Sequence, residues 1–154
     1  MKETKIQALL VRGGANDLIP LTQILDQLVK VTDARSCEEA ARYLHKPNPP
    51  PLVFTDTTLP DGTWVEVLHL ATRAPKPVNV VVIARIADVR LYIEAMNTGA
   101  FDFVTASSVV PEVAHVLRNA AENVLSRRGA QDRLCPESAA GTGKKKPLWW
   151  SRSA

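Results

Sequence analysis

The sequence of 154 residues has few of the features that define several large classes of protein. It contains two cysteines, Cys37 and Cys135, too few and too far apart for a disulfide framework or a zinc cluster. No segment approaches the roughly 18 uninterrupted apolar residues of a membrane-spanning helix. The first residues also lack the apolar core and cleavage site of a signal peptide. We therefore expect a cytoplasmic protein in a reducing environment, without a transmembrane segment.

A charge excess is also missing from most of the chain. Residues 129–154 carry five basic and two acidic side chains, which accounts for the whole net charge of +3. The preceding residues, 1–128, are balanced. A basic groove on the folded domain is thus not expected, and neither is a nucleic acid partner for this chain.

What the chain does contain is an alternation of strand-like and helix-like segments. Short apolar, β-branched runs predict strands, and apolar residues at helical spacing follow each of them. This alternation predicts an α/β fold, a doubly wound five-stranded parallel sheet with five helices and the flavodoxin-like strand order 2-1-3-4-5. The predicted strands cover residues 5–11, 29–32, 52–56, 78–84 and 101–104.

Polar residues mark where the helices begin. Asn16 or Asp17 is expected to cap the first helix, and Ser36, Asp88 and Ser108 are expected to cap the second, fourth and fifth. The third is expected to start at Gly62-Thr63. The apolar stripe of every helix is interpreted as core, including that of the fourth helix. In that helix the stripe consists of Val89, Tyr92, Ile93 and Met96.

The last helix is expected to fade at Arg127-Arg128-Gly129, which places the domain at residues 1–128. Residues 129–154 are predicted to be a basic, disordered tail. A run of three lysines, Lys144–Lys146, precedes Trp149 and Trp150 there. Two interpretations stay open, a solvated tail or a short segment that docks on a protein or a membrane surface.

The most informative residue is Asp56, which ends the buried run Leu52-Val53-Phe54-Thr55. Ligands and chemistry collect at the carboxyl ends of parallel strands, so this is where a doubly wound protein would place a reactive acid. The alternative is an ordinary turn aspartate before Pro60 and Gly62.

Residues 5–127 resemble the receiver domain of bacterial two-component response regulators, the CheY-like fold. The resemblance rests on Asp56 with Leu59-Pro60 after it, on the strand Pro77–Ala84, and on the run Gly99-Ala100-Phe101-Asp102-Phe103. It implies that a histidine kinase phosphorylates Asp56 and that the carboxylate forms an acyl phosphate. It also implies a Mg²⁺ held by an acidic pair, with a lysine and a hydroxyl nearby.

Several positions depart from the family pattern. Arg12 and Gly13 stand where the acidic pair is expected, and Ala84, followed by Arg85, stands at the hydroxyl position. Ala106 replaces the lysine, and the switch aromatic is Phe103. We therefore expect that the conventional Mg²⁺ site is lost and that the domain has no cofactor. We hypothesise that the guanidinium of Arg12 or Arg85 lies near Asp56 in place of the metal.

These departures favour an atypical receiver, a signalling module that binds proteins and is not an enzyme. The resemblance implies that a histidine kinase or a downstream signalling protein, or a second copy in a homodimer, binds the face of the fourth helix, fifth strand and fifth helix. That face offers Arg90, Glu94, Asn97, His115, Arg118, Asn119 and Glu122. One alternative is a genuine response regulator phosphorylated on Asp56. A less favoured alternative is a small nucleotide-binding enzyme with Arg12-Gly13-Gly14-Ala15 as a phosphate loop.

Overall fold

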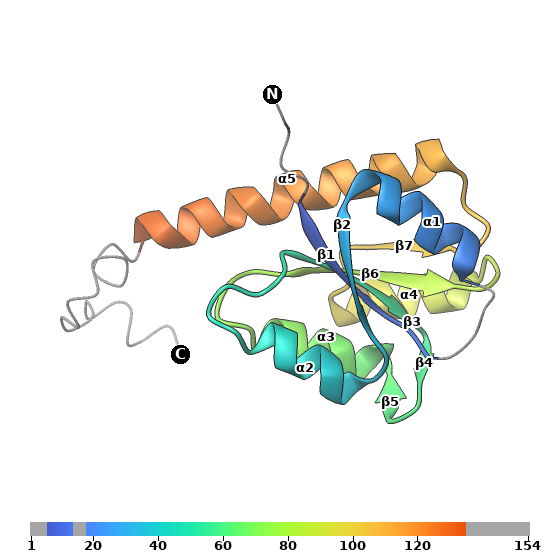
Figure 1. Cartoon of the computed structure of the whole chain (residues 1–154), viewed down its shortest axis with the longest axis horizontal. Helices are drawn as coiled ribbons and strands as arrows, with labels where there is room; N and C mark the ends of the chain where they lie inside the picture. Colours follow the sequence, from blue (N-terminus) through green and yellow to red (C-terminus); the bar gives the residue numbers. More distant parts are fainter. Residues whose placement is uncertain (1–5, 14–17, 135–154) are drawn as a thin grey trace.

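The structure is a computed structural model, and it describes residues 6–13 and 18–134 (Figure 1). Five parallel strands form one sheet in the order β2-β1-β3-β6-β7. This confirms the predicted order 2-1-3-4-5, because β6 and β7 are the fourth and fifth strands of the sheet. The strands are β1 Gln7–Val11, β2 Lys30–Ala34, β3 Leu52–Asp56, β6 Asn79–Ala84 and β7 Asp102–Thr105.

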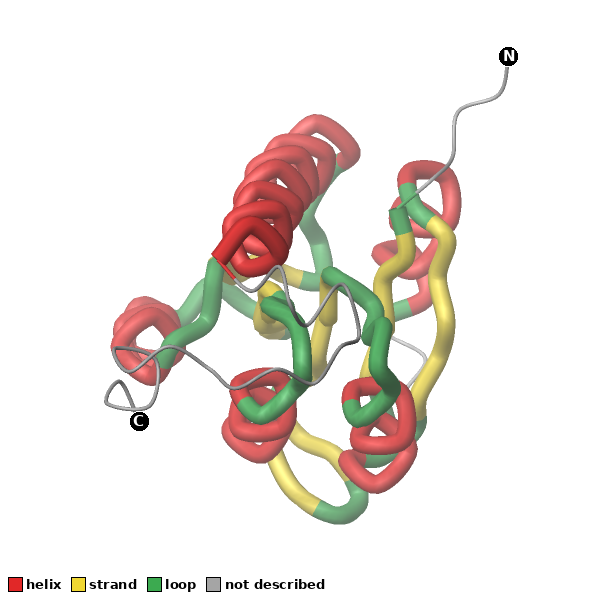
Figure 2. Tube along the Cα trace, turned by 90° about the vertical axis from the view of Figure 1, so that its left-hand side faces the viewer, coloured by secondary structure: helices red, strands yellow, loops and turns green. Residues whose placement is uncertain are grey.

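The helices of the described residues, five in number, lie on the two faces of this sheet, as Figure 2 shows. One apolar cluster joins α1 and α5 to the sheet, and a second joins α2, α3 and α4 to the opposite face. The predicted doubly wound fold is therefore confirmed. The helices are α1 Ile19–Leu28, α2 Cys37–Leu44, α3 Trp64–Thr72, α4 Val89–Thr98 and α5 Val110–Leu134.

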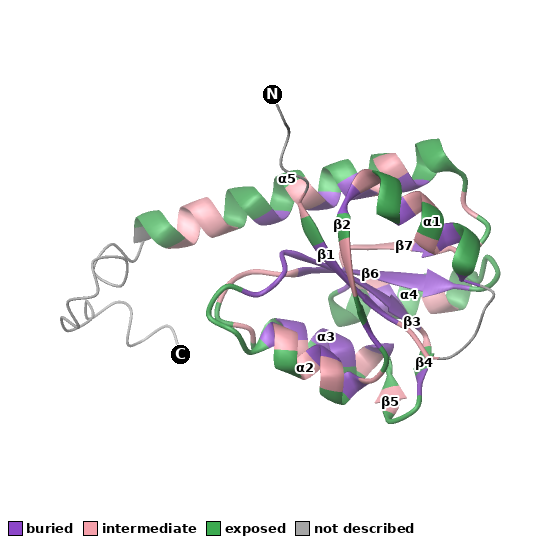
Figure 3. Cartoon of the chain, viewed as in Figure 1, coloured by how far each residue is buried: buried purple, intermediate pink, exposed green. Residues whose placement is uncertain are grey.

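The core lies on both sides of the two central strands, β3 and β6, in which every residue is buried (Figure 3). Their side chains alternate between the two clusters, so that Val53 packs toward α3 while Phe54 packs toward α1 and α5. From α1, Leu21 and Leu25 are each 1% exposed. Full burial of such a side chain contributes roughly 1.5–3 kcal/mol. These two strands thus contribute to both halves of the core along their whole length.

Three of the expected helix starts are confirmed by hydrogen bonds from side chains to backbone. The Ser36 hydroxyl accepts from the Glu39 amide at 3.1 Å, and the Asp88 carboxylate accepts from the Leu91 amide at 3.2 Å. Thr63 caps α3, where it forms a reciprocal capping box with Glu66. Such caps satisfy amide groups that have no partner inside the helix.

Two other caps differ from the prediction. Ser108 does not cap α5, since its hydroxyl accepts from the Thr105 amide at 3.1 Å and thereby closes the turn after β7. Asn16 and Asp17 lie outside the described residues, and the residue at the start of α1 is Leu18, without a side-chain cap. Pro20 in the first turn of α1 favours helix formation there because its φ is already helical.

The expected end of the last helix is wrong. Helix α5 continues through Leu134, beyond Arg127-Arg128-Gly129, and its last turns extend past the rest of the domain (Figure 1). Side-chain contacts from Arg127, Arg128 and Gln131 to the sheet and its loops hold this part of the helix. The rest of the predicted tail, including Lys144–Lys146, lies outside the described residues. None of the helices in the described part of the chain is long and apolar enough to cross a membrane.

A second prediction that fails is the burial of the α4 apolar residues. Val89 is 73% exposed and Ile93 is 52% exposed, and Ala95 is the buried residue of this helix. The stripe has the period of a core-facing helix, but α4 turns most of it toward solvent. Apolar period alone does not reveal whether the protein itself covers the stripe.

Candidate functional site

Asp56 is the last residue of β3, the central strand, with β1 on one side and β6 on the other. Asp56 is 2% exposed, and its Oδ1 accepts a hydrogen bond of 2.7 Å from the Thr57 amide. A buried carboxylate of this kind requires a compensating positive charge, because removing an ion from water is expensive.

Arg85 supplies that positive charge. It follows directly after β6, which pairs with β3 so that Asp56 lies opposite Ile83. From this position its Nη1 donates to Asp56 Oδ1 in a charge-assisted hydrogen bond. The Asp56 side chain is 3% exposed and that of Arg85 37% exposed. We call Asp56, Thr57 and Arg85 the Asp56 site.

Arg12, the other arginine considered as a substitute for the metal, is used differently. Its Nε lies 3.3 Å from Asp33 Oδ1 on β2, and its amide donates to Ala34 at 2.9 Å. Arg12 therefore ties β1 to β2. The hypothesis of a guanidinium next to Asp56 is confirmed for Arg85, whereas for Arg12 it is wrong.

The other predicted positions surround this pair at the carboxyl edge of the sheet. Ala84 ends β6, and its carbonyl accepts from the Ala106 amide at 2.7 Å. Phe103 on β7 packs edge-on against Tyr92 of α4, with ring centroids 5.7 Å apart. Gly13 lies beside the hairpin after Asp56, with space for a Cβ. None of these side chains offers a charge or a hydroxyl to Asp56.

The residues described at this edge do not fit a Mg²⁺ ion. Among residues 6–13 and 18–134 no three carboxylate, histidine or cysteine groups are close enough to share one. Asp56 Oδ1 accepts from a guanidinium and an amide instead. Magnesium prefers several oxygen ligands, usually including more than one carboxylate or phosphate. We therefore derive no step through a metal.

A hairpin that the sequence reading did not predict follows Asp56. Its strands are β4 Thr58–Leu59 and β5 Gly62–Thr63. Asp61 at its tip accepts from the Cys37 amide at 2.8 Å and the Glu38 amide at 3.1 Å, at the start of α2. These hydrogen bonds lower the pKa of Asp61. The signal that could have revealed the hairpin is the turn sequence Pro60-Asp61-Gly62.

The same contact affects the thiol of Cys37. Burial raises the pKa of Cys37 to about 11, and the charge of Asp61 contributes in the same direction. The thiol therefore stays protonated at neutral pH. The segment after Asp56 is thus anchored to α2 by a carboxylate beside an inert cysteine.

An exposed apolar surface lies next to the site, on α4 and the loop before it. Ile86 and Val89 are each 73% exposed, Ile93 is 52% exposed and Tyr92 is 44% exposed. We call these four residues the α4 stripe. Their spacing places them along one side of the helix. Sequence reasoning assigned most of them to the core and did not single out Ile86.

The polar residues expected on the partner face are all exposed, as predicted. They are Arg90, Glu94, Asn97, His115, Arg118, Asn119 and Glu122. His115 and Asn119 hydrogen-bond to each other at 3.2 Å along α5. Of the possible phosphate loop, Gly14 and Ala15 lie outside the described residues.

Comparison with solved structures identifies the fold. The signal receiver domain of an HD domain-containing protein from Pseudomonas fluorescens Pf-5 has a TM-score of 0.70 and 22% identity, covering 84% of this chain and 96% of that chain. A response regulator receiver domain protein from Clostridium thermocellum has a TM-score of 0.65 and 21% identity, covering 77% and 95%. A CheY-like receiver domain protein from Methanospirillum hungatei JF-1 has a TM-score of 0.65 and 17% identity, covering 80% and 98%.

No family model matches the sequence, and no curated protein matches it either. The structural similarity shows that the chain has the CheY-like receiver fold, as the resemblance in sequence implied. At these levels of sequence identity the similarity establishes the fold alone, and the function has to be argued from the site.

Proposed function

We propose that this chain is an atypical receiver module of two-component signal transduction, which binds a partner protein without conventional Mg²⁺-dependent phosphorylation. The observation that carries the proposal is the ion pair between Asp56 and Arg85. The guanidinium supplies the positive charge that the buried carboxylate requires, without a metal ion. The module then has no enzymatic activity of its own and acts by presenting a surface in the cytoplasm.

The partner surface we propose is the face of α4, β7 and α5. The α4 stripe supplies its apolar centre, and the exposed charged residues around it supply a polar rim, the usual anatomy of a protein interface. Exposed apolar residues gathered on one helix mark interaction sites more often than scattered ones do. A histidine kinase, a downstream signalling protein or a second copy of the chain is the partner.

Intact mass spectrometry after incubation with acetyl phosphate and Mg²⁺ tests the proposal. We expect no added phosphoryl group on the full chain. Calorimetric titration with Mg²⁺ should likewise show no saturable uptake. The Arg85→Ala variant is the informative companion, because it frees the carboxylate without changing Asp56 itself.

A second function is a genuine response regulator in which Asp56 is phosphorylated. The 37% exposure of the Arg85 side chain favours it, since such an arginine has room to turn and pair with a phosphoryl group. A mass increase on the full chain that disappears in Asp56→Asn would establish this function and reject the first.

A mutation on the α4 stripe tests the partner surface. Ile93→Lys should abolish binding to a cognate kinase, or self-association in analytical ultracentrifugation, without loss of stability. Ile19→Lys is the matched control, because Ile19 on α1 is 43% exposed and α1 packs on the face of the sheet opposite to α4. Equal effects of the two substitutions would argue against the surface.

A further inference from the structure

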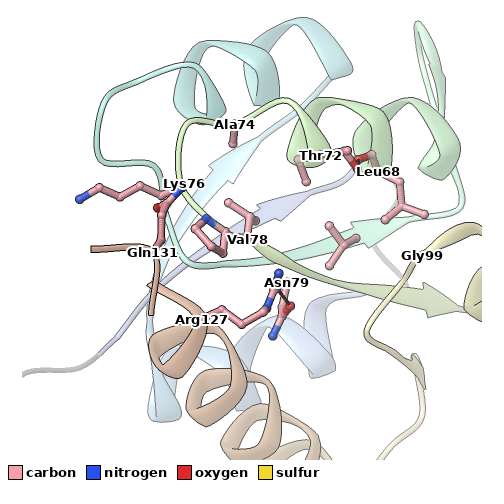
Figure 4. A pocket seen from close by; sticks show the side chains of 12 residues that line it. Leu68, Thr72, Ala74, Lys76, Val78, Asn79, Gly99, Arg127 and Gln131 are labelled. Carbon is pink, nitrogen blue, oxygen red and sulfur yellow. Dashed lines mark hydrogen bonds between the residues drawn. The ribbon is translucent and has the colours of Figure 1, made fainter. Parts of the chain in front are cut away.

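A cavity of about 360 Å³ lies at the amino edge of the sheet, opposite the Asp56 site. The end of α3, the start of β6 and the last third of α5 line it, and it is open to solvent (Figure 4). Its volume falls within the range of about 300–1,000 Å³ that is typical of small-ligand sites. We call it the Arg127 cavity.

The accessible lining of the cavity is mostly polar and positively charged, with a smaller apolar part. Val78, just before β6, is half-buried there, whereas the apolar lining residues Leu68, Ala71 and Val80 are at most 6% exposed. Of the residues that the structure describes, Arg127 and Lys76 are the charged ones in its lining, and none of the described lining residues is acidic. The Lys76 ammonium turns outward to Asn48 Oδ1 at 3.3 Å, which leaves Arg127 as the charge beside the cavity (Figure 4).

Arg127 is oriented by neutral groups. Its Nε donates to Asn123 Oδ1 at 3.1 Å, and its Nη2 donates to Asn79 Oδ1. Asn79 is 4% exposed and donates in turn to the Ala120 carbonyl at 2.9 Å and to Asn123 Oδ1 at 3.1 Å. The guanidinium is held in place while donors on Nη1 and Nη2 stay available, because arginine has five N–H groups. Among the described residues, it forms no ion pair with a carboxylate.

The next residue adds a second cation that is also bound to neutral oxygens. Arg128 Nε donates to the Pro77 carbonyl at 2.8 Å, and Nη2 donates to the Pro49 carbonyl at 2.9 Å. Burial lowers the pKa of Arg128, and the charge of Arg127 lowers it further, against a smaller opposing effect of Asp132. Positive charge is thus concentrated at this edge, with little compensation.

We propose that the Arg127 cavity binds a small organic anion, a carboxylate or phosphate carried on a compact apolar body. The oxyanion pairs with the guanidinium of Arg127, whose planar fork suits both groups. The body packs on Val78. A ligand there contacts α3, β6 and α5 together, and so stabilises the attachment of the extended α5.

Chemical-shift titration of the full ¹⁵N-labelled chain, at constant ionic strength, tests the proposal with four probes. Phenyl phosphate and benzoate carry the two oxyanions on one ring, benzyl alcohol is the neutral control, and inorganic phosphate lacks the apolar body. We expect saturable shifts at Val78, Val80 and Gly99 with phenyl phosphate or benzoate. Either anion should bind at least about tenfold more tightly than benzyl alcohol or inorganic phosphate. The tighter of the two identifies the oxyanion.

Variants locate the site. Arg127→Gln should weaken binding about tenfold, whereas Arg118→Gln, an exposed position on the same helix outside the cavity, should leave it unchanged. Ala74→Trp fills the cavity and leaves the contacts of Arg127 intact, so it should also abolish binding and decides the matter if Arg127→Gln unfolds. Three outcomes overturn the proposal: no saturable shifts, equal binding of benzyl alcohol, or binding that survives Ala74→Trp.

Discussion

At the carboxyl edge of the sheet Arg85 donates to the buried carboxylate of Asp56, and at the amino edge Arg127 donates to the buried amide of Asn79. Both acceptors are almost wholly buried, at 2% and 4% exposure, and both sit at an end of a central strand. The geometry is similar, but Asp56 cancels the charge of its arginine, whereas Asn79 does not.

This difference separates the two edges chemically. At the carboxyl edge the cation and the anion neutralise each other, so the site has less attraction for either Mg²⁺ or phosphate. At the amino edge the arginine is positioned but its charge remains, which is the arrangement that attracts an anion. The contrast follows from one difference, a carboxylate at the end of one strand and an amide at the end of the other.

The largest effect is expected from Arg85→Gln. Removing the guanidinium leaves the Asp56 carboxylate buried and unpaired, which should lower the free energy of unfolding by about 2 kcal/mol. The loss is smaller than for a fully buried pair because the Arg85 side chain is 37% exposed. Urea unfolding at pH 7 measures it.

Two further variants define that result. Arg90→Gln, at an exposed position on α4, should change the free energy of unfolding little. Adding Asp56→Asn to the Arg85→Gln variant should restore much of the stability that Arg85→Gln loses. A loss under about 0.5 kcal/mol for Arg85→Gln, the range of ordinary surface substitutions, would mean that the pair contributes nothing.

At the amino edge, Asn79→Ala should lower the free energy of unfolding by about 1.5 kcal/mol. The change removes one of the two hydrogen-bond acceptors of Arg127, the other being Asn123, and leaves the Ala120 carbonyl without its side-chain donor. The same urea experiment measures it, with Asn97→Ala on exposed α4 as the control. If Asn79→Ala lowers the free energy of unfolding more than Arg85→Gln does, the ion pair at the carboxyl edge is not the stronger of the two contacts, and the comparison of the edges is wrong.

Acid should affect the two edges differently. The folded pKa of Asp61 is lowered, so its contact with α2 is present at neutral pH and is lost as pH falls through that pKa, below its ordinary value of about 4. In NMR spectra the Cys37 and Glu38 amides should titrate in this range. The side-chain amide of Asn79, which has no carboxylate partner, should not.

Asp61→Asn is the control for the acid titration, since it should abolish the change at the Cys37 and Glu38 amides. Simultaneous change at both edges in the unmodified chain would indicate global unfolding and would remove the distinction.

The smallest effect concerns the reactivity of Cys37. In a Cys135→Ser background, Asp61→Asn should speed alkylation by iodoacetamide at pH 8, because one cause of the raised thiol pKa is removed. The gain should stay below about tenfold, since burial is the larger cause and persists. Glu38→Gln provides the control, and an unchanged rate in Asp61→Asn would show that Asp61 does not contribute to the raised thiol pKa.

The alternation of strands and helices and three of the helix caps could be predicted because their signals are local. Each of these signals indicates structure within a few residues of itself. They are the buried run ending at Asp56 and the capping residues Ser36, Thr63 and Asp88. The strand order was expected only because five βα units suit the flavodoxin-like order, and no local signal indicates it. The hairpin at Asp61 was missed, although Pro60-Asp61-Gly62 is a turn sequence. Its consequence, the capping of α2 from a distant segment, is visible only in three dimensions.

Other outcomes depended on contacts between distant segments. The α4 stripe has the same period as the buried stripe of α1, and only the packing of the two helices distinguishes a core face from an exposed one. Helix α5 continues past Gly129 because Arg128 and Gln131 bind carbonyls of Pro77 and Pro75. No signal close to Gly129 in sequence indicates those partners.

The sequence by itself determined the alternation of strands and helices, the position of Asp56 at a strand end, and the presence of arginine instead of acidic residues around it. Only the tertiary structure decided that Arg85 reaches Asp56 while Arg12 turns to Asp33, and that Arg127 meets an amide. The reason is that periodicity and capping act over a few residues. Which charges come together depends instead on the lateral order of the strands and on the direction in which each chain leaves the sheet.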